Sequence, residues 1–329
     1  MKNNKKIALI TGIAGQDGSY LSELLLTLNY KVFGIIRRKS IVEHQADRIE
    51  DIGLRNDIEL LHGDMTDTSS LEKLTKLIQP DEIYNLAAQS HVRISSEVPK
   101  FTAEVNGLGV LNILEAYREN CPKAKFYQAS SSEMFGNSTD SDKYQRETTS
   151  FSPTSPYGCA KVFGYNIVRH YRKAYNLFCS NGILFNHESP RRGSNFVTNK
   201  VIKTAVEIKL GLKDKLVLGN LDSYRDWGHS KDYVRAMNLI LQHEKADDFV
   251  IATGTSRSVR DMCKYVFDKL ELNMMDFIKQ DQVYMRPQEL DYLRGDSSKA
   301  RKTLGWKPKI SFEELMDEMI EHWFNKLKK

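Results

Sequence analysis

The sequence predicts an α/β protein with a Rossmann-type, doubly wound parallel sheet and a smaller, interleaved α/β domain. Short apolar segments alternate with segments of helical periodicity from the start of the chain, and a glycine-rich turn joins the first strand to the first helix. The 329 residues are 40% hydrophobic and 28% charged, which suits two domains or one large unit with an appendage. This composition excludes a disordered chain, a collagenous repeat and a disulfide scaffold.

The first half of the chain alternates strands with helices. The expected strands are apolar or rich in β-branched residues and span 7–11, 31–36, 58–61, 83–88 and 125–129. The expected helices have apolar residues three or four positions apart and comprise 20–28, a segment opened by a capping-box pattern at Ser69 and Glu72, and 105–117. This alternation favours a parallel sheet with helices on both faces.

The second half is less regular. Segments 180–185 and 249–252 resemble further strands of the same sheet, and 196–210 resembles a helix. A wide apolar stripe over 312–327 indicates a packed terminal helix. Because no clean linker is visible, we expect interleaved domains. The first comprises 1–186 with return segments near 225–255, and the second lies mainly in 187–329.

The charge and the cysteine spacing limit the kinds of partner and bound group that the protein can have. The net charge is +5, but the basic residues are scattered along the sequence, so no nucleic-acid interface is predicted. Short groups of basic residues could instead bind a phosphorylated small molecule. No two of the four cysteines have CxxC spacing, so we expect free thiols and no metal site. No apolar run reaches the length of about 18 residues that a membrane span needs, and no signal peptide is visible. We therefore expect a cytoplasmic protein without membrane contact.

The glycine-rich turn lies directly between the first strand and the first helix. Its residues are Gly12, Gly15, Gln16, Asp17 and Gly18. Glycines at these positions allow a tight turn and the close approach of a pyrophosphate to the helix N-terminus. The structural alternative is a glycine-rich turn without a ligand, but the strand–turn–helix context favours dinucleotide binding.

Two arginines, Arg37 and Arg38, follow the second strand, where an NAD enzyme would carry an acidic residue. Two guanidiniums would bind a ribose 2′-phosphate by charge-assisted bonds, so NADP is the expected cofactor, unless the pair lies on a solvated loop. Asp64 and Met65 follow the third strand, near the expected adenine. The residues expected to line the nicotinamide side follow the fourth strand and are Leu86, Ala87, Ala88, Gln89 and Ser90.

Tyr157 and Lys161 are four residues apart, on one face of an expected helix. A phenol has an unperturbed pKa of about 10, and we expect the ammonium and the positive nicotinamide to lower it so that Tyr157 acts as a base. Ser131 and Glu133 follow the fifth strand, whose carboxyl end should face the ligand crevice. The alternative interpretation of Glu133 is a surface acid in a loop, without a catalytic role.

Taken in order, these motifs resemble the GDP-mannose 4,6-dehydratase family of extended short-chain dehydrogenases/reductases. The resemblance rests on TGxxGQDG, the arginine pair, Gln-Ala-Ser-x-Ser-Glu, Tyr-x-x-x-Lys, the stretch 186–193 (NHESPRRG) and the stretch 225–229 (RDWGH). It covers nearly the whole chain. The last two stretches are the most specific to this family, whereas the glycine motif is shared across the superfamily.

The resemblance implies an internal redox reaction on a GDP-sugar. Tyr157 would take the proton of the sugar 4-hydroxyl while NADP takes the C4 hydride. Glu133 would then remove the C5 proton and help water leave C6, with Ser131 assisting, before hydride returns to C6. The product would be a 4-keto-6-deoxy sugar.

The resemblance also implies binding residues beyond these. His187 and Arg192 would lie on the cofactor side, and the substrate would contact Ser90, Ser131, Glu133, Asn186, Lys200, Arg225, Arg286 and Glu289. The polar segment Arg37–Glu43 matches a loop that takes part in subunit contacts, so a homotetramer or at least a homodimer is expected.

Two departures from the family leave the substrate open. Ser131 stands where threonine is usual, and the stretch between Leu272 and Arg286 is shorter than in typical members. A shortened wall could admit GDP-D-glycero-manno-heptose in place of GDP-mannose. The enzyme alternative is a sugar-nucleotide 4-epimerase or reductase of the same superfamily, and a remote alternative is a non-catalytic NADP sensor.

Overall fold

The computed structural model describes residues 5–38, 40, 45–285 and 287–328. Seven parallel strands form one sheet in the order β10-β6-β5-β4-β1-β2-β3, which confirms the predicted doubly wound topology. The strands are β1 (Ile7–Thr11), β2 (Lys31–Ile36), β3 (Ile58–His62), β4 (Glu82–Asn85), β5 (Lys125–Ser131), β6 (Cys179–Leu184) and β10 (Asp248–Ile251). The strand order reverses between β1 and β4, where an open α/β sheet forms its ligand crevice.

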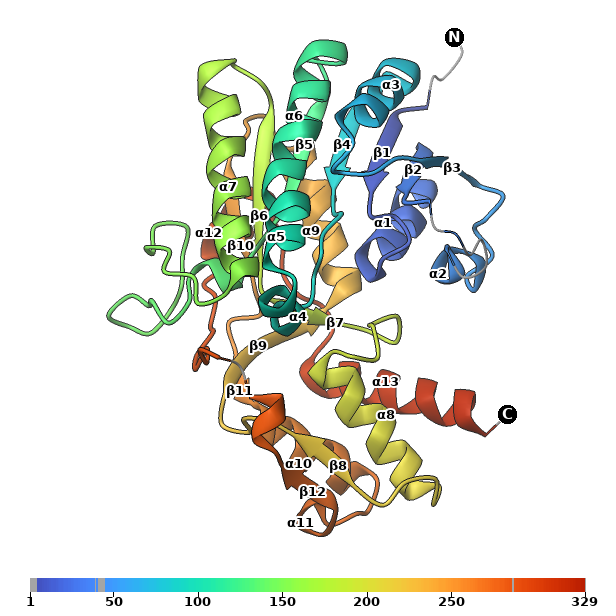
Figure 1. The fold of residues 1–329 in the computed structure, drawn as a ribbon, viewed down its shortest axis with the longest axis vertical. Coiled ribbons are helices and arrows are strands. Elements are labelled where there is room, and N and C mark those ends of the chain that lie inside the picture. Colours follow the sequence, from blue (N-terminus) through green and yellow to red (C-terminus); the bar gives the residue numbers. More distant parts are fainter. Residues whose placement is uncertain (1–4, 39, 41–44, 286, 329) are drawn as a thin grey trace.

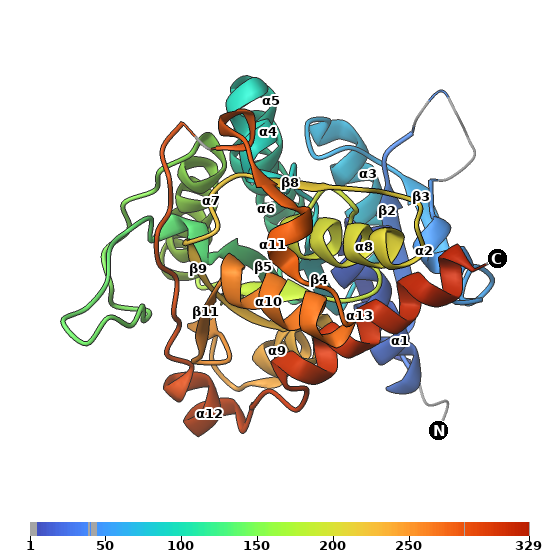
Figure 2. The ribbon, with the colours of Figure 1, turned by 90° about the horizontal axis from the view of Figure 1, so that it is seen from below.

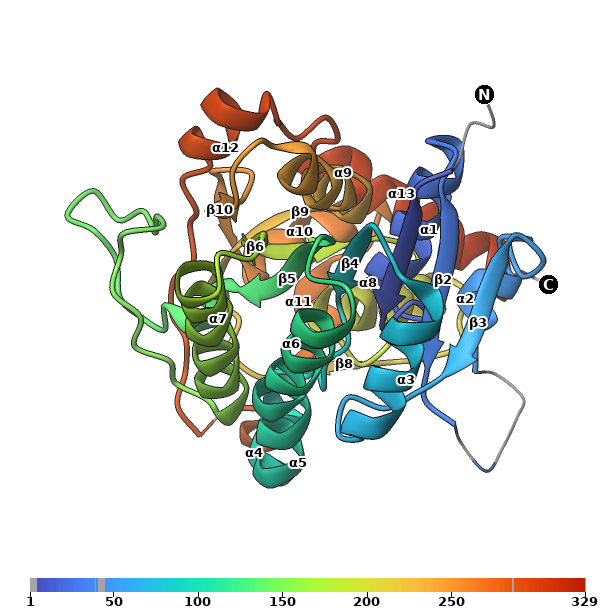
Figure 3. The ribbon, with the colours of Figure 1, turned by 90° about the horizontal axis from the view of Figure 1, so that it is seen from above.

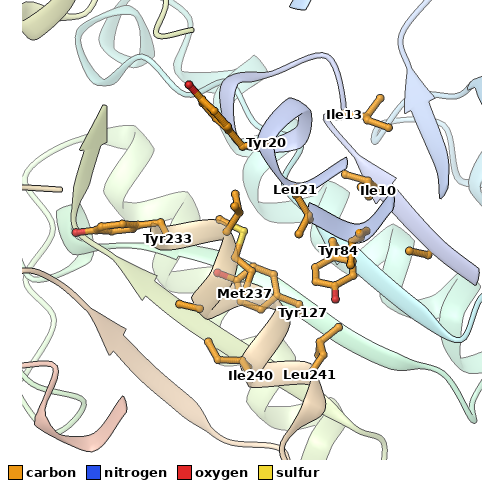
Figure 4. Close-up of a cluster of buried hydrophobic side chains, with 14 of the residues drawn as sticks. Ile10, Ile13, Tyr20, Leu21, Tyr84, Tyr127, Tyr233, Met237, Ile240 and Leu241 are labelled. Carbon is orange, nitrogen blue, oxygen red and sulfur yellow. The ribbon is translucent and has the colours of Figure 1, made fainter. Parts of the chain in front are cut away.

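Helices cover both faces of this sheet (Figure 3). One face carries α1 (Gln16–Thr27) and α9 (Ser230–Gln242), and the other carries α3 (Thr68–Ile78), α6 (Gly109–Asn120) and α7 (Pro156–Ala174). Each face has its own apolar cluster. Figure 4 shows the cluster on the α1 and α9 face, where Met237 and Ile240 lie in the same buried group as Tyr127.

A second lobe lies at the carboxyl end of the sheet (Figures 1 and 2). Its helices are α8 (Val197–Lys209), α10 (Val259–Lys269), α11 (Met274–Phe277) and α13 (Phe312–Leu327). Its strands form a parallel pair, β8 (Leu216–Leu218) and β12 (Ile278–Gln280), and a three-stranded sheet of β7 (Asn186–Glu188), β9 (Tyr224–His229) and β11 (Ser256–Ser258). A third apolar cluster holds the four helices together with β8, β9 and β12. The domain boundary that we expect near residue 186 stays a prediction.

Short elements complete the chain. They are α2 (Asp47–Glu50), α4 (Val92–Glu97), α5 (Pro99–Ala103), the π-helical turn η1 (Glu104–Leu108), the 3₁₀ turns η2 (Ser132–Met134) and η3 (Gln282–Tyr284), and α12 (Ser298–Leu304).

Three local predictions are wrong. α3 begins at Thr68 rather than after a Ser69 cap, because the Asp67 carboxylate accepts a hydrogen bond from the Ser70 amide at 3.3 Å. β4 ends at Asn85 instead of reaching residue 88, and the next two amides, of Leu86 and Ala87, donate to Thr11 Oγ1 at 3.1 and 3.0 Å. The expected helix over 105–117 begins as the π turn η1 before α6.

Within the described ranges, 5–38, 40, 45–285 and 287–328, none of the helices combines the length and the apolar character that a bilayer span requires.

Candidate active site

A cleft with a volume of about 760 Å³ separates the carboxyl edge of the large sheet from the second lobe. It gathers most of the predicted site residues from segments far apart in the chain. Those lining it are Asp17, Leu86, Ala88, Ser90, Ser131, Glu133, Tyr157, Lys161, Asn186, His187, Arg192, Lys200, Arg225 and Glu289. Arg286 lies outside the described residues.

The glycine turn forms one end of this site. Gly12 has φ +69°, and a Cβ there would lie 2.8 Å from the Ala87 amide nitrogen, so a side chain does not fit. Gly15 is the N-cap of α1, and no side chain caps that helix. The amides of the first helical turn can therefore receive an anion, which fits the pyrophosphate of a dinucleotide.

Asp17 and His187 tie this turn to β7. Nε2 of His187 lies 2.7 Å from Oδ2 of Asp17, and its Nδ1 lies 2.7 Å from the Phe185 carbonyl oxygen. Because both ring nitrogens of His187 face hydrogen-bond acceptors, the doubly protonated, charged imidazolium is favoured. Burial lowers the pKa of His187, but the Asp17 charge and hydrogen bond outweigh it, so the net shift is upward. Burial likewise raises the pKa of Asp17, and the charge of His187 reverses that shift.

The first turns of α7 present Tyr157 and Lys161 to the cleft. Ser155 caps the helix by accepting a hydrogen bond from the Gly158 amide at 3.1 Å. Nζ of Lys161 donates to the Ala129 carbonyl at 2.8 Å and lies 5.7 Å from the centre of the Tyr157 ring. Burial lowers the pKa of Lys161 to about 8.

The pKa of the Tyr157 phenol also depends on burial. Burial raises the pKa of Tyr157 to about 12, although a hydrogen bond from the Ser131 hydroxyl works in the opposite direction. The nearby Glu133 carboxylate adds to the upward shift. Burial thus decides the direction of the shift in the chain alone, and the predicted lowering by the ammonium together with a bound nicotinamide stays a prediction.

Glu133 sits in the short turn η2, immediately after β5. The hydroxyl oxygen of Ser131 caps this turn and accepts a hydrogen bond from the Glu133 amide at 3.2 Å. Glu133 is only 6% exposed, yet it lines the cleft with Ser131 and Tyr157. A carboxylate, a hydroxyl and a phenol thus share one water-poor site, which can support proton transfer in two directions.

The second lobe contributes cations. Lys200 of α8 donates to the Val217 carbonyl at 2.7 Å, and Arg225 of β9 donates to the Tyr224 carbonyl at 2.8 Å. Nε of Arg192 lies 3.0 Å from Oε2 of Glu188. These side chains are held in place before any ligand arrives, which lowers the entropic cost of binding an anion.

Asn186 and Glu289 complete the predicted substrate set. Oδ1 of Asn186 is buried and has no hydrogen-bond partner among the described residues, so it can accept a bond from a ligand. The backbone carbonyl of Glu289 accepts a hydrogen bond from Asn137 at 3.2 Å, and the residue lines the cleft.

The residues expected around the adenosine lie outside the cleft lining. Arg37 and Arg38 are exposed just beyond β2, with Arg38 Nη1 3.5 Å from Nε2 of His62. Asp64 accepts hydrogen bonds from the amide and hydroxyl of Thr66 at 2.9 and 2.8 Å. The other predicted residues that do not line the cleft are Gly12, Gly15, Gln16, Gly18, Met65, Ala87 and Gln89.

Sequence reasoning missed Arg48, a residue of the four-residue helix α2. Its guanidinium donates to the Ala14 carbonyl at 3.1 Å and to the Arg191 carbonyl at 2.8 Å. It therefore joins the glycine turn to the loop that carries Arg192. No sequence signal marks it, because α2 is too short for a periodic pattern and both partners are backbone atoms.

The fold resembles that of solved nucleotide-sugar epimerases and dehydratases. The UDP-glucose 4-epimerase of Thermotoga maritima has a TM-score of 0.84 at 24% identity, covering 98% of this chain and 100% of that one. The dTDP-glucose 4,6-dehydratase of Bacillus anthracis has a TM-score of 0.83 at 22% identity, covering 98% and 97%. At these identities the similarity establishes the fold.

Sequence comparison is more specific. The GDP-mannose 4,6 dehydratase family model matches residues 9–319. GDP-mannose 4,6 dehydratase 2 of Arabidopsis thaliana is 50% identical over 327 residues, covering 96% of this chain and 86% of the relative. GDP-mannose 4,6 dehydratase of Homo sapiens is 46% identical over 346 residues, covering 97% and 92%. The chain belongs to the GDP-mannose 4,6-dehydratase family.

Proposed function

We propose that this chain is an NADP-dependent hydro-lyase that converts GDP-mannose into the GDP-4-keto-6-deoxy sugar. The observation that carries the proposal is the position of Glu133, which shares the cleft with Tyr157 and Lys161. Oxidation of an alcohol needs a single base, whereas elimination of water also needs a group that removes the C5 proton and protonates the leaving hydroxyl.

In this reaction the phenolate of Tyr157 accepts the proton of the sugar 4-hydroxyl, and the Ser131 hydroxyl stabilises that phenolate before the transfer and the sugar oxygen during it. Bound NADP would supply the acceptor for the C4 hydride and later the donor for C6, so it would be regenerated in each turnover. The ketone at C4 acidifies the C5 proton, which Glu133 takes. Glu133 then returns this proton to the C6 hydroxyl, which leaves as water. After hydride has returned to C6, Tyr157 would give its proton to C5 of the resulting enolate, so both residues regain their starting charge.

The chain's own residues fit a dinucleotide. The uncapped N-terminus of α1 would receive the pyrophosphate, and the glycine turn leaves no side chain in its way. The exposed Arg37 and Arg38 favour a 2′-phosphate and hence NADP over NAD. A solved relative by fold, RMD of Pseudomonas aeruginosa, is described as a complex with NADPH.

Relatives that cover nearly the whole chain are named for GDP-mannose, which supports the hexose over GDP-D-glycero-manno-heptose. Lys200, Arg225 and Glu289 would hold the GDP portion, and Asn186 would contact the nucleotide sugar. The shorter segment before residue 286 keeps the heptose as an outcome to be tested beside the hexose.

Turnover of GDP-mannose deuterated at C4 tests this function. With purified protein and NADP, we expect loss of one water per sugar and transfer of the label to C6. Label returned to C4 of an epimerised sugar would instead establish the 4-epimerase alternative, and a product reduced at the expense of NADPH would establish a reductase. GDP-D-glycero-manno-heptose, run in parallel, should turn over more slowly. Absence of turnover with NADP binding intact would favour the non-catalytic sensor.

Two further expectations accompany this proposal. The homo-oligomer rests on segment 37–43, of which residues 39 and 41–43 lie outside the described residues, so it stays a prediction. Cytoplasmic localisation also stays a prediction.

A further inference from the structure

Tyr284 has two cations over its ring, and they come from different parts of the fold. Nζ of Lys200, on α8, lies 3.8 Å from the ring centre, and Cζ of Arg93, on α4, lies 5.6 Å from it. All three side chains line the cleft. Arg93 therefore reaches the second lobe from the sheet side, at the point where the chain leaves β4.

The charges of Lys200 and Arg93 are not neutralised by a strong ion pair within the described residues. Within the described part of the chain, no carboxylate lies within 4.0 Å of Lys200, whose hydrogen bond goes to the uncharged Val217 carbonyl. Burial and then the charges of Arg93 and Lys213 lower the pKa of Lys200. Arg93 pairs with Glu97 at 3.8 Å, one turn along α4, but that carboxylate is 63% exposed and the pair is weak.

We propose that Arg93 binds the diphosphate of the nucleotide sugar, from the side of the cleft opposite to Lys200. The proposal rests on the proposed function, since it names a contact to that substrate class. A diphosphate between the two cations would relieve their mutual repulsion. The planar guanidinium offers several donors to phosphate oxygens, and the Tyr284 ring orients it by a cation–π contact.

Neither sequence motifs nor the set of expected substrate residues includes Arg93. The four expected anchors Lys200, Arg225, Arg286 and Glu289 all belong to the second half of the chain. Arg93 would be the phosphate contact contributed by the sheet side, so bound substrate would connect the two sides of the cleft. Tyr284 belongs to the stretch that we expect to be shorter than in typical family members, so this contact would lie at that wall of the cleft.

Calorimetric titration with GDP and with guanosine tests the contact. Arg93→Gln removes the charge, Arg93→Lys keeps it, and Lys100→Gln removes a surface charge from the next helix as a control. Lys100 is 89% exposed and pairs with Glu104. We expect Arg93→Gln to weaken GDP binding and raise KM for the nucleotide sugar roughly tenfold, with kcat changed less than about twofold. Arg93→Lys should retain most of the affinity, and Lys100→Gln should match the parent protein.

The affinity for guanosine distinguishes a contact of Arg93 to phosphate from a purely structural role of Arg93. Its affinity should be the same in all variants, because it carries no phosphate. Equal losses for guanosine and GDP, or unchanged GDP affinity in Arg93→Gln, would overturn the proposal. The GDP titration needs no turnover, so it is independent of the proposed function. A parent protein that binds GDP through Arg93 but does not dehydrate GDP-mannose would refute the proposed function alone.

Discussion

Nε2 of His229, at the end of β9, lies 2.8 Å from Oε2 of Glu318 on α13, and the His229 side chain is fully buried. Nδ1 of the same ring accepts a hydrogen bond from the Lys231 amide at 2.9 Å and so caps α9. One imidazole thus connects the terminal helix, the three-stranded sheet and a helix of the large sheet.

This contact predicts a stability change with pH. The hydrogen bond from His229 lowers the pKa of Glu318 to about 2, from 4.5. A depressed carboxyl pKa stabilises the fold above pH 4.5, and this contribution disappears as the pH falls towards 2. Because Glu318 is partly exposed, we expect Glu318→Gln to lower the free energy of unfolding by about 1–2 kcal/mol at neutral pH. In denaturant titrations the gap should narrow towards low pH, and Glu321→Gln should show no such gap.

Glu133→Gln tests the elimination step. An amide keeps the size of the side chain but neither takes nor returns a proton, so turnover should fall by roughly 10²–10⁴-fold. Oxidation at C4 should persist, and it is visible as NADPH absorbance in a single turnover. Glu104→Gln, at a partly exposed position of η1, serves as the control. A Glu133→Gln protein that releases product at the parent rate would remove Glu133 from the mechanism.

Replacing Asp17 alone should destabilise the chain more than replacing Asp17 and His187 together. Asp17→Asn leaves a buried imidazolium without its counter-charge, and we expect a loss of about 3 kcal/mol in the free energy of unfolding. The double variant Asp17→Asn with His187→Gln should recover part of this loss. Chemical denaturation of the single and double variants measures the coupling. Strictly additive effects would mean that the two groups do not form a charged pair.

Gly18→Ala tests the close packing of the glycine turn. The added Cβ would lie 2.5 Å from the Gly12 carbonyl oxygen and the Ile13 Cα, so backbone atoms must move. We expect a loss of about 1–3 kcal/mol in stability together with weaker NADP binding. Gly107→Ala is the matched control, because its nearest neighbour is Cδ1 of Phe163 at 3.4 Å. Equal behaviour of the two variants in thermal unfolding and NADP titration would contradict this interpretation.

Cofactor choice should depend on the arginines after β2. We expect replacement of Arg37 and Arg38 by alanine to weaken NADP binding roughly ten- to a hundredfold while NAD binding changes little. Titration with both dinucleotides measures the ratio directly. Parallel losses for NAD and NADP would show that the pair does not recognise the 2′-phosphate.

Local sequence patterns were sufficient for the large sheet. The first three strands and the terminal helix were predicted within a few residues, because each has an apolar period of its own and the glycine turn marks where the first βα unit bends. The strand ends were harder to predict. β4 stops at Asn85 because Thr11 of the neighbouring strand captures the next two amides, and that contact joins residues far apart in the chain.

The residues of the candidate site also fall into those that local sequence patterns predicted and those that they missed. Tyr157, Lys161 and Glu133 were predicted because recognisable motifs surround them, and the structure brings all three to one cleft. Arg48 and Arg93 were missed because their partners are backbone carbonyls or an aromatic ring in distant segments. The burial that raises the pKa of Tyr157 in the chain alone was not predicted, because spacing along a helix carries no information about burial.

The return of the chain to the large sheet has a consequence for dissecting this protein. α9 and β10 follow α8, β8 and β9 in sequence, yet they complete one face and one edge of the sheet. A fragment that stops after β7 would expose the side chains against which Met237 and Ile240 pack. We expect such a fragment to aggregate, so the nucleotide-binding half cannot be produced, swapped or fused as an autonomous module.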